Sequence, residues 1–123
     1  RPWLPVHPDY VERNVAAQTA QADSLLNIYS QLLALRRATP ALLRGDLTLL
    51  DGLPRDVLAY RRTYEGSQAL VLLNMGASNR RIELSDREMN WRLLWNSHPG
   101  AADPRSGRLV NLAADQAVIL LNY

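Results

Sequence analysis

The sequence predicts a mainly β protein, in which an N-terminal extended arm and one long α-helix precede an antiparallel β-sandwich of about seven strands. Residues 1–22 contain three prolines and no regular spacing of apolar residues, whereas residues 23–37 carry apolar residues at helical intervals. After Gly45 the pattern changes to short runs rich in Leu, Val and Tyr, which turn residues separate. The chain has 123 residues, 47% hydrophobic and 21% charged, so it suffices for one globular domain and two complete domains are excluded.

Proline and capping signals define the arm and the helix. Each proline disfavours the α conformation in the residue before it, so we expect residues 1–22 to be extended. Asp23 and Ser24 are suited to cap a helix, and Pro40 predicts that this helix ends near Arg37. The apolar residues of the helix cover about half of its circumference, which is wider than the roughly 100° stripe that one packing partner requires. The helix is therefore expected to contact two partners.

The sandwich is predicted from turn chemistry at short intervals. Asp51-Gly52, Glu65-Gly66-Ser67 and Ser106-Gly107 supply residues that tolerate positive φ or cap a turn. Close spacing without helices between the strands favours antiparallel neighbours in two sheets. Residues 23–45 thus form the helix and its connection, and residues 46–123 the sandwich, with the run 69–73 in a central strand. The strands are predicted at 46–50, 56–64, 68–75, 79–84, 90–96, 108–112 and 117–123.

Charge and hydropathy exclude two classes of partner. The isoelectric point is near 9.4, but the net charge is only +2, and all 14 basic residues are arginines scattered among 12 acidic ones. The high isoelectric point therefore reflects the absence of lysine and does not indicate a basic patch for nucleic acid. The longest apolar runs, AVILL and LVLL, are far shorter than the roughly 20 residues that cross a bilayer. We expect neither a nucleic acid nor a membrane as partner.

The residues that carry chemistry are few and dispersed. The absence of cysteine excludes disulfides, thiolate metal sites and a thiol nucleophile, and it does not assign the chain to a compartment. His7 and His98 are too few for a catalytic zinc, which needs three protein ligands. Asp9 and Glu12 form an acidic pair on the arm, where nothing is expected to hold them as a catalytic pair. The sequence predicts no metal site, no cofactor and no catalytic residue.

A tryptophan cluster is the most suggestive motif for binding. In NWRLLWNSHPG, residues 90–100, alternation places Trp91, Leu93 and Trp95 on one face of a strand. Two indoles on one strand face could stack on sugar rings, and they could equally be part of the sandwich core. We interpret them as core, with a sugar platform as the alternative. Tyr60 and Tyr64 receive the same interpretation.

Part of the chain resembles a known family. PWLPVHPDY at 2–10, NVAAQ at 14–18 and DSLLNIYSQLLALRRATPALLRG at 23–45 resemble the C-terminal part of the α-glucosidase and oligo-1,6-glucosidase branch of the α-amylase family of glycoside hydrolases. The resemblance covers the first third of the chain, and beyond it only the strand pattern agrees. His7 and Asp9 depart from that branch, which often has asparagines there, so the type of substrate stays open. With no initiator Met and no leader, we expect the chain to be a segment of a longer protein.

The resemblance implies a (β/α)₈ barrel ahead of this chain, with the active site at the C-terminal ends of its strands. Residues 1–22 would be the loop after the last barrel strand, residues 23–37 the last barrel helix and residues 46–123 the sandwich that follows. The family uses an Asp nucleophile, a Glu acid/base and a second Asp, and all three would precede this chain. Trp3, between prolines on the arm, would border the substrate mouth.

These observations lead to one preferred function and two alternatives. The preferred function is an accessory domain that stabilises the missing barrel of a retaining α-glycoside hydrolase or transglycosidase and is inactive by itself. The alternatives are a carbohydrate-binding module that uses Trp91 and Trp95, or the tail of a non-catalytic glucosidase-like partner subunit. A further hypothesis is self-association through the exposed apolar face of residues 25–35, because large apolar patches are rarely left in water.

Overall fold

The computed structural model describes residues 3–84 and 90–122, and the chain divides into two compact units, residues 1–38 and residues 39–123. The first unit consists of helices and connecting segments, and the second contains the sheets. No described helix is both long enough and apolar enough to span a membrane.

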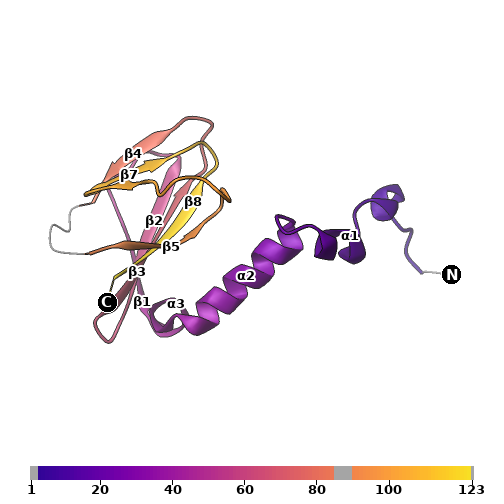
Figure 1. Ribbon diagram of the computed structural model, residues 1–123, viewed down its shortest axis with the longest axis horizontal. Helices are drawn as coiled ribbons and strands as arrows, with labels where there is room; N and C mark the ends of the chain where they lie inside the picture. The colour runs from indigo at the N-terminus through magenta and orange to yellow at the C-terminus, as the bar shows by residue number, and fades with distance from the viewer. Residues whose placement is uncertain (1–2, 85–89, 123) are drawn as a thin grey trace. The chain divides into compact units, whose positions relative to one another are not determined.

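The first unit contains three helical segments (Figure 1). The prediction of an extended arm is wrong for two segments of residues 1–22, which form short helices. Each of these helices begins at a local cap. The 3₁₀ helix η1, Pro8–Val11, has proline at its first turn, where no backbone N–H is required, and the His7 side chain caps it. The helix α1, Val15–Ala20, begins at Asn14, whose side-chain oxygen accepts from the Ala17 N–H.

The predicted long helix is confirmed as α2, Leu25–Ala38. The backbone N–H of Asn27 donates to the Ser24 hydroxyl at 3.3 Å, which confirms Ser24 as a cap. The helix buries none of its residues, and Leu25, Tyr29 and Leu33 are 75%, 63% and 42% exposed. Its assignment as the last barrel helix stays a prediction.

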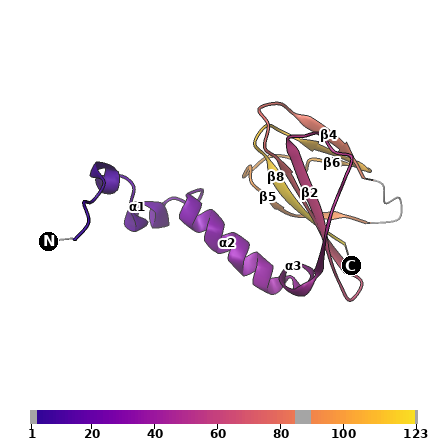
Figure 2. The same ribbon diagram turned by 180° about the vertical axis from the view of Figure 1, so that it is seen from behind.

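The second unit begins with a short helix, α3, Pro40–Arg44. Pro40 follows the end of α2 at Ala38, as predicted, and it also occupies the first position of α3. Two antiparallel sheets follow, which form the two layers of a sandwich (Figure 1), and Figure 2 shows them from behind. One sheet has five strands in the order β1-β2-β3-β8-β5, and the other has three in the order β4-β7-β6. The strands are β1 Asp46–Leu49, β2 Val57–Tyr64, β3 Ser67–Asn74, β4 Arg80–Glu83, β5 Arg92–Asn96, β6 Arg105–Ser106, β7 Leu109–Leu112 and β8 Ala117–Asn122.

The seven predicted strands are present, and the two-residue β6 is the one that the sequence did not predict. The predicted central strand is confirmed, because β3 lies in the middle of the five-stranded sheet. Two residues other than glycine have positive φ in the described part of the chain, Glu65 at 47° in a predicted turn and Asp115 at 53° in the turn between β7 and β8.

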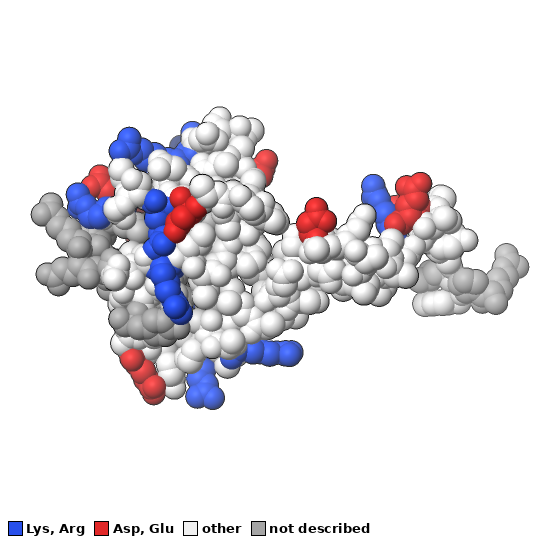
Figure 3. Space-filling model, viewed as in Figure 1, with Lys and Arg blue, Asp and Glu red and all other residues white. Residues whose placement is uncertain are grey.

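The main core lies between the two sheets. Alternate residues of the strands face inward, and Leu72, Val110, Val118 and Leu120 are fully buried there. Burial of this apolar layer provides the main favourable contribution to the stability of the unit. The face that Figure 3 shows carries basic and acidic side chains interspersed over a largely uncharged surface, without a continuous basic patch.

Candidate functional site

The structure places the three tryptophans in different surroundings. Trp3, in the first unit, is 92% exposed. Trp91 is 8% exposed and belongs to the sandwich core, where its indole N–H has no hydrogen-bond partner. Trp95 is half-buried on β5.

A β-bulge separates Trp91 from Trp95. Along β5, Leu93 pairs with Leu120 and Trp95 pairs with Ile119, so Leu94 is the extra residue. Leu120 faces the core, whereas its neighbour Ile119 faces the other side of the sheet. The prediction that Trp91, Leu93 and Trp95 share one face is therefore wrong, because the bulge shifts the alternation by one residue. Trp95 lies on the face opposite to Trp91.

This opposite side of the five-stranded sheet, here called the outer face, is apolar across every strand. Cross-strand partners share a face, so the pairings define one continuous row over the sheet. The row runs through Leu49, Tyr60, Val71, Ile119 and Trp95.

Two residues interpreted as core lie on this outer face. Tyr60 is in the row, and Tyr64 alternates with it along β2. The inward residues of the same strand, Val57 and Ala59, are the ones in the core cluster. The core interpretation of the two tyrosines is wrong, because alternation along β2 turns them to the side of the sheet opposite to Val57 and Ala59.

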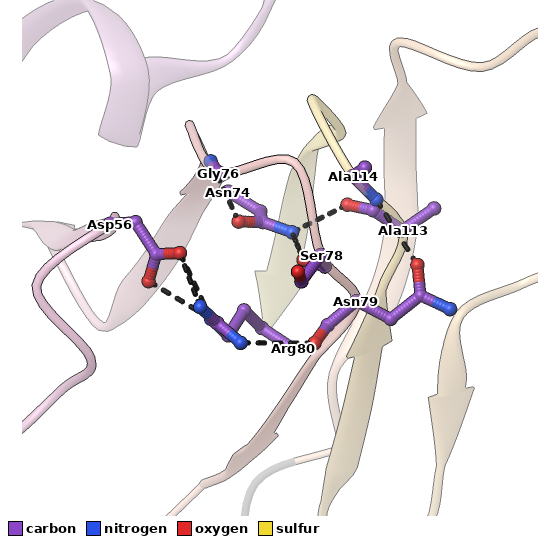
Figure 4. Close-up of polar contacts among 8 residues, drawn as sticks. All are labelled: Asp56, Asn74, Gly76, Ser78, Asn79, Arg80, Ala113 and Ala114. Carbon is purple, nitrogen blue, oxygen red and sulfur yellow. Dashed lines mark hydrogen bonds and ion pairs between the residues drawn. The ribbon is translucent and has the colours of Figure 1, made fainter.

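A polar cluster fixes the connection between the two sheets (Figure 4). Asn74 is 2% exposed, and its side-chain amide donates to the carbonyls of Ser78 and Ala113 at 2.8 and 2.7 Å. Its side-chain oxygen accepts from the Gly76 N–H at 3.1 Å. One asparagine side chain thus forms hydrogen bonds with backbone groups of both the β3–β4 link and the turn after β7.

An ion pair lies beside this cluster. The Arg80 guanidinium donates to both carboxylate oxygens of Asp56, with Nε at 2.9 and 3.1 Å. These hydrogen bonds hold the pKa of the Asp56 carboxyl below its usual value, against the opposing effect of desolvation. The pair joins the start of β2 to β4.

A cavity of about 410 Å³ lies at the end of the sandwich, and Asp103 is the carboxylate among its described lining residues. Arg105 donates to Asp103 and thereby lowers the pKa of that carboxyl. A glycosidase needs two carboxylates beside one bond. The cavity therefore lacks the catalytic pair of a glycosidase.

The remaining titratable groups do not form a reaction centre in the part of the chain that the structure describes. No group of three His, Cys, Asp or Glu residues there is arranged to hold a metal ion. On the arm, Asp9 contacts His7 and lies 3.5 Å from an Arg13 guanidinium nitrogen, so nearby groups engage its carboxylate. His98 contacts the Ser97 hydroxyl at 3.0 Å in the segment after β5, far in sequence from His7.

Comparison with known proteins finds related glucosidases and synthases, although no family model matches the chain. A glucan 1,6-alpha-glucosidase of Streptococcus dysgalactiae subsp. equisimilis is 38% identical over 73 residues, which are 59% of this chain and 13% of that protein. An oligo-1,6-glucosidase of Halalkalibacterium halodurans is 36% identical over the same fractions. Among solved structures, the trehalulose synthase of Pseudomonas mesoacidophila matches with a TM-score of 0.85 and 32% identity, over 100% of this chain and 22% of that one. The isomaltulose synthase of Protaminobacter rubrum matches with a TM-score of 0.87 and 30% identity over the same fractions.

The chain is homologous to the C-terminal part of α-amylase-family enzymes. It spans 13% of the length of these two glucosidases and 22% of these two synthases, and it has the fold of their C-terminal accessory domain. The resemblance stated for the first third of the sequence is confirmed.

Sequence reasoning missed the outer face of this accessory domain. Its signal was present, because β2, β3 and β8 carry apolar residues at odd and even positions alike. Such strands are typical of sheets covered on both sides. Nothing in the sequence indicated the bulge that turns Trp95 to this face.

Proposed function

We propose that this chain is the C-terminal accessory domain of a retaining α-glycoside hydrolase or transglycosidase, and that it stabilises the catalytic barrel. The observation that carries the proposal is the matched coverage: all of this chain aligns with solved synthases, and it accounts for 22% of their length. The substrates of the relatives favour α-glucosides. The chain by itself is inactive, because the catalytic carboxylates belong to the barrel.

The polar groups of the described residues support an accessory role. Asp56 and Asp103 are each engaged by an arginine, and neither lies in a pair of carboxylates set to flank a glycosidic bond. The alternative of a carbohydrate-binding module loses support, because Trp91 is in the core and Trp95 is on the other side of the sheet.

The experiment is to sequence the DNA upstream of the codon for Arg1. We expect an open frame of at least about 250 residues, the usual size of such a barrel, with two Asp and one Glu at strand ends. A start codon directly before Arg1 would overturn the proposal in favour of a free-standing module. A frame without those carboxylates would instead indicate a non-catalytic partner subunit, and it would overturn the enzymatic part of the proposal.

A further inference from the structure

The cavity of about 410 Å³ at the end of the sandwich has the size of a small-molecule site, for which about 300–1,000 Å³ is usual. It is lined by the segment between β5 and β6, by β6 itself, and by the end of β7 with the turn that follows. Its apolar lining consists mostly of short side chains, which are Ala101, Ala102, Pro104, Leu112 and Ala113. Side chains of this kind leave room for a ligand beside them.

Several polar side chains of the lining keep a hydrogen-bonding group that has no partner among the described residues. The Asn79 side-chain oxygen accepts from the Ala114 N–H at 3.3 Å, and the amide nitrogen beside it is unengaged there. The Ser106 hydroxyl and the Asn111 side-chain amide also form no hydrogen bond with the part of the chain that the structure describes. An amide and a hydroxyl can each donate and accept, so these groups suit a ligand rich in hydroxyls.

The His98 ring adds a donor to this lining. Its Nδ1 lies 3.0 Å from Ser97 Oγ, and that oxygen accepts from the Ala117 N–H at 2.9 Å. Because the hydroxyl oxygen already accepts one hydrogen bond, its own proton is donated to Nδ1, and this network assigns the proton of a neutral imidazole to Nε2. Nε2 is therefore the donor that the ring offers to a ligand.

A buried glutamine holds two parts of the lining together. Gln116 is 4% exposed, and its side-chain oxygen accepts from the Ala113 N–H at 2.7 Å. Its side-chain nitrogen donates at 2.9 Å to the Asn96 side-chain oxygen, which also accepts from the His98 N–H at 3.0 Å. These hydrogen bonds join the turn after β7 to the segment after β5, so the lining is organised before any ligand binds.

Arg105 and Asp103 bring opposite charges to the cavity, and the two cancel. Nε of Arg105 donates to both carboxylate oxygens of Asp103 at 2.9 and 3.0 Å. An anion would have to displace this carboxylate, and the described residues hold no group of three His, Cys, Asp or Glu for a metal ion. An apolar ligand would leave the amide and hydroxyl groups without hydrogen bonds, which costs free energy. The lining therefore fits an uncharged ligand with many hydroxyl groups.

We propose that this cavity binds one glucose ring of an α-glucoside. A glucose ring carries hydroxyls around its edge and C–H groups on its faces, so Asn79, Ser106 and Asn111 pair with the hydroxyls. Pro104 and Leu112 contact the C–H groups. The inference goes beyond the proposed function, because it assigns a ligand to the accessory domain itself, and only the choice of an α-glucoside rests on that function.

The test follows the backbone amides of the isotope-labelled chain by NMR during a titration with maltotriose, because neither Trp91 nor Trp95 lines the cavity to report on it by fluorescence. We expect saturable shifts at residues 98–106 and 111–113, while the amides of β1 stay unmoved. Glycerol at the same concentration is the control for an unspecific polyol and should shift none of them. No saturable shift with maltotriose, or equal shifts with glycerol, would overturn the site. Saturation by inorganic phosphate alone would do the same in favour of an anion site.

Three variants locate the binding. Asn111→Ala and Ser106→Ala should each weaken maltotriose binding about five-fold, because each removes about one hydrogen bond to the sugar. Thr48→Ala, which changes an exposed side chain on β1, is the control and should leave the binding constant unchanged. Circular dichroism checks that the variants are folded, as expected for side chains that form no hydrogen bond with the described residues. Unchanged binding in both cavity variants would contradict the inference.

The full-length parent enzyme gives a second measurement that does not depend on the folding of the isolated chain. Hydrogen exchange, read by mass spectrometry, should slow several-fold in the peptide over residues 97–106 when maltotriose is present. Equal exchange with and without the sugar would overturn the site. It would leave the proposed function standing, since that function fails only if no barrel frame lies upstream.

Discussion

Replacing Asn74 by alanine tests whether the buried side-chain amide stabilises the link between the two sheets. Asn74→Ala removes three hydrogen bonds, two to carbonyls at 2.8 and 2.7 Å and one from an N–H at 3.1 Å. Each contributes about 1 kcal/mol net, and backbone groups left without a partner cost more, so the expected loss in the free energy of unfolding is about 2–4 kcal/mol.

Urea denaturation of the isolated chain, followed by circular dichroism, measures this loss. The midpoint should fall while the slope m stays unchanged, because the surface exposed on unfolding is nearly the same. Asn111→Ala is the matched control: Asn111 is exposed on β7, so its replacement should change the free energy of unfolding by no more than about 0.5 kcal/mol. Asn74→Asp should cost at least as much as the alanine variant, because a carboxylate oxygen would face two carbonyl oxygens.

The reasoning would be refuted if Asn74→Ala were as mild as Asn111→Ala. That result would mean that water replaces the amide at no cost, and that the link between the sheets does not depend on this side chain. A changed slope m would indicate instead that the variant alters the unfolded or the folded ensemble.

Three further predictions concern the same unit. Trp91→Ala should lower the free energy of unfolding, measured by urea denaturation, by about 3–5 kcal/mol, and a loss below about 1 kcal/mol would contradict a core role for this indole. The Asp56 pKa is held below its usual 3.8 in the folded state, so its stabilising effect is complete above that value and is lost as pH falls through the lower folded pKa. Asp56→Asn should therefore flatten the acid side of a stability-against-pH curve measured by urea denaturation, and an unchanged curve would contradict this. Gly45→Ala should cost about 1–3 kcal/mol in the same assay, because the added Cβ would collide with the backbone of Ala41 and Thr63, and a neutral result would show that α3 shifts freely.

The sequence by itself determined the class of fold and the family. Apolar periodicity predicted the helix now seen at Leu25–Ala38, and turn residues at short intervals predicted seven of the eight strands. These features are local, since a cap, a proline or a Gly-containing turn acts within a few residues. The motifs of the first third carried the resemblance to α-amylase-family enzymes, which homology confirms.

Only the tertiary structure decided which side chains face which layer. One extra residue in β5 moved Trp95 away from Trp91, and no local pattern encodes such a bulge because it depends on pairing with β8. The pairings of five strands likewise brought residues as distant as Leu49 and Ile119 into one apolar row. Asn74 and Ala113 meet for the same reason, because contacts between residues far apart in the chain exist only once the sheets have formed.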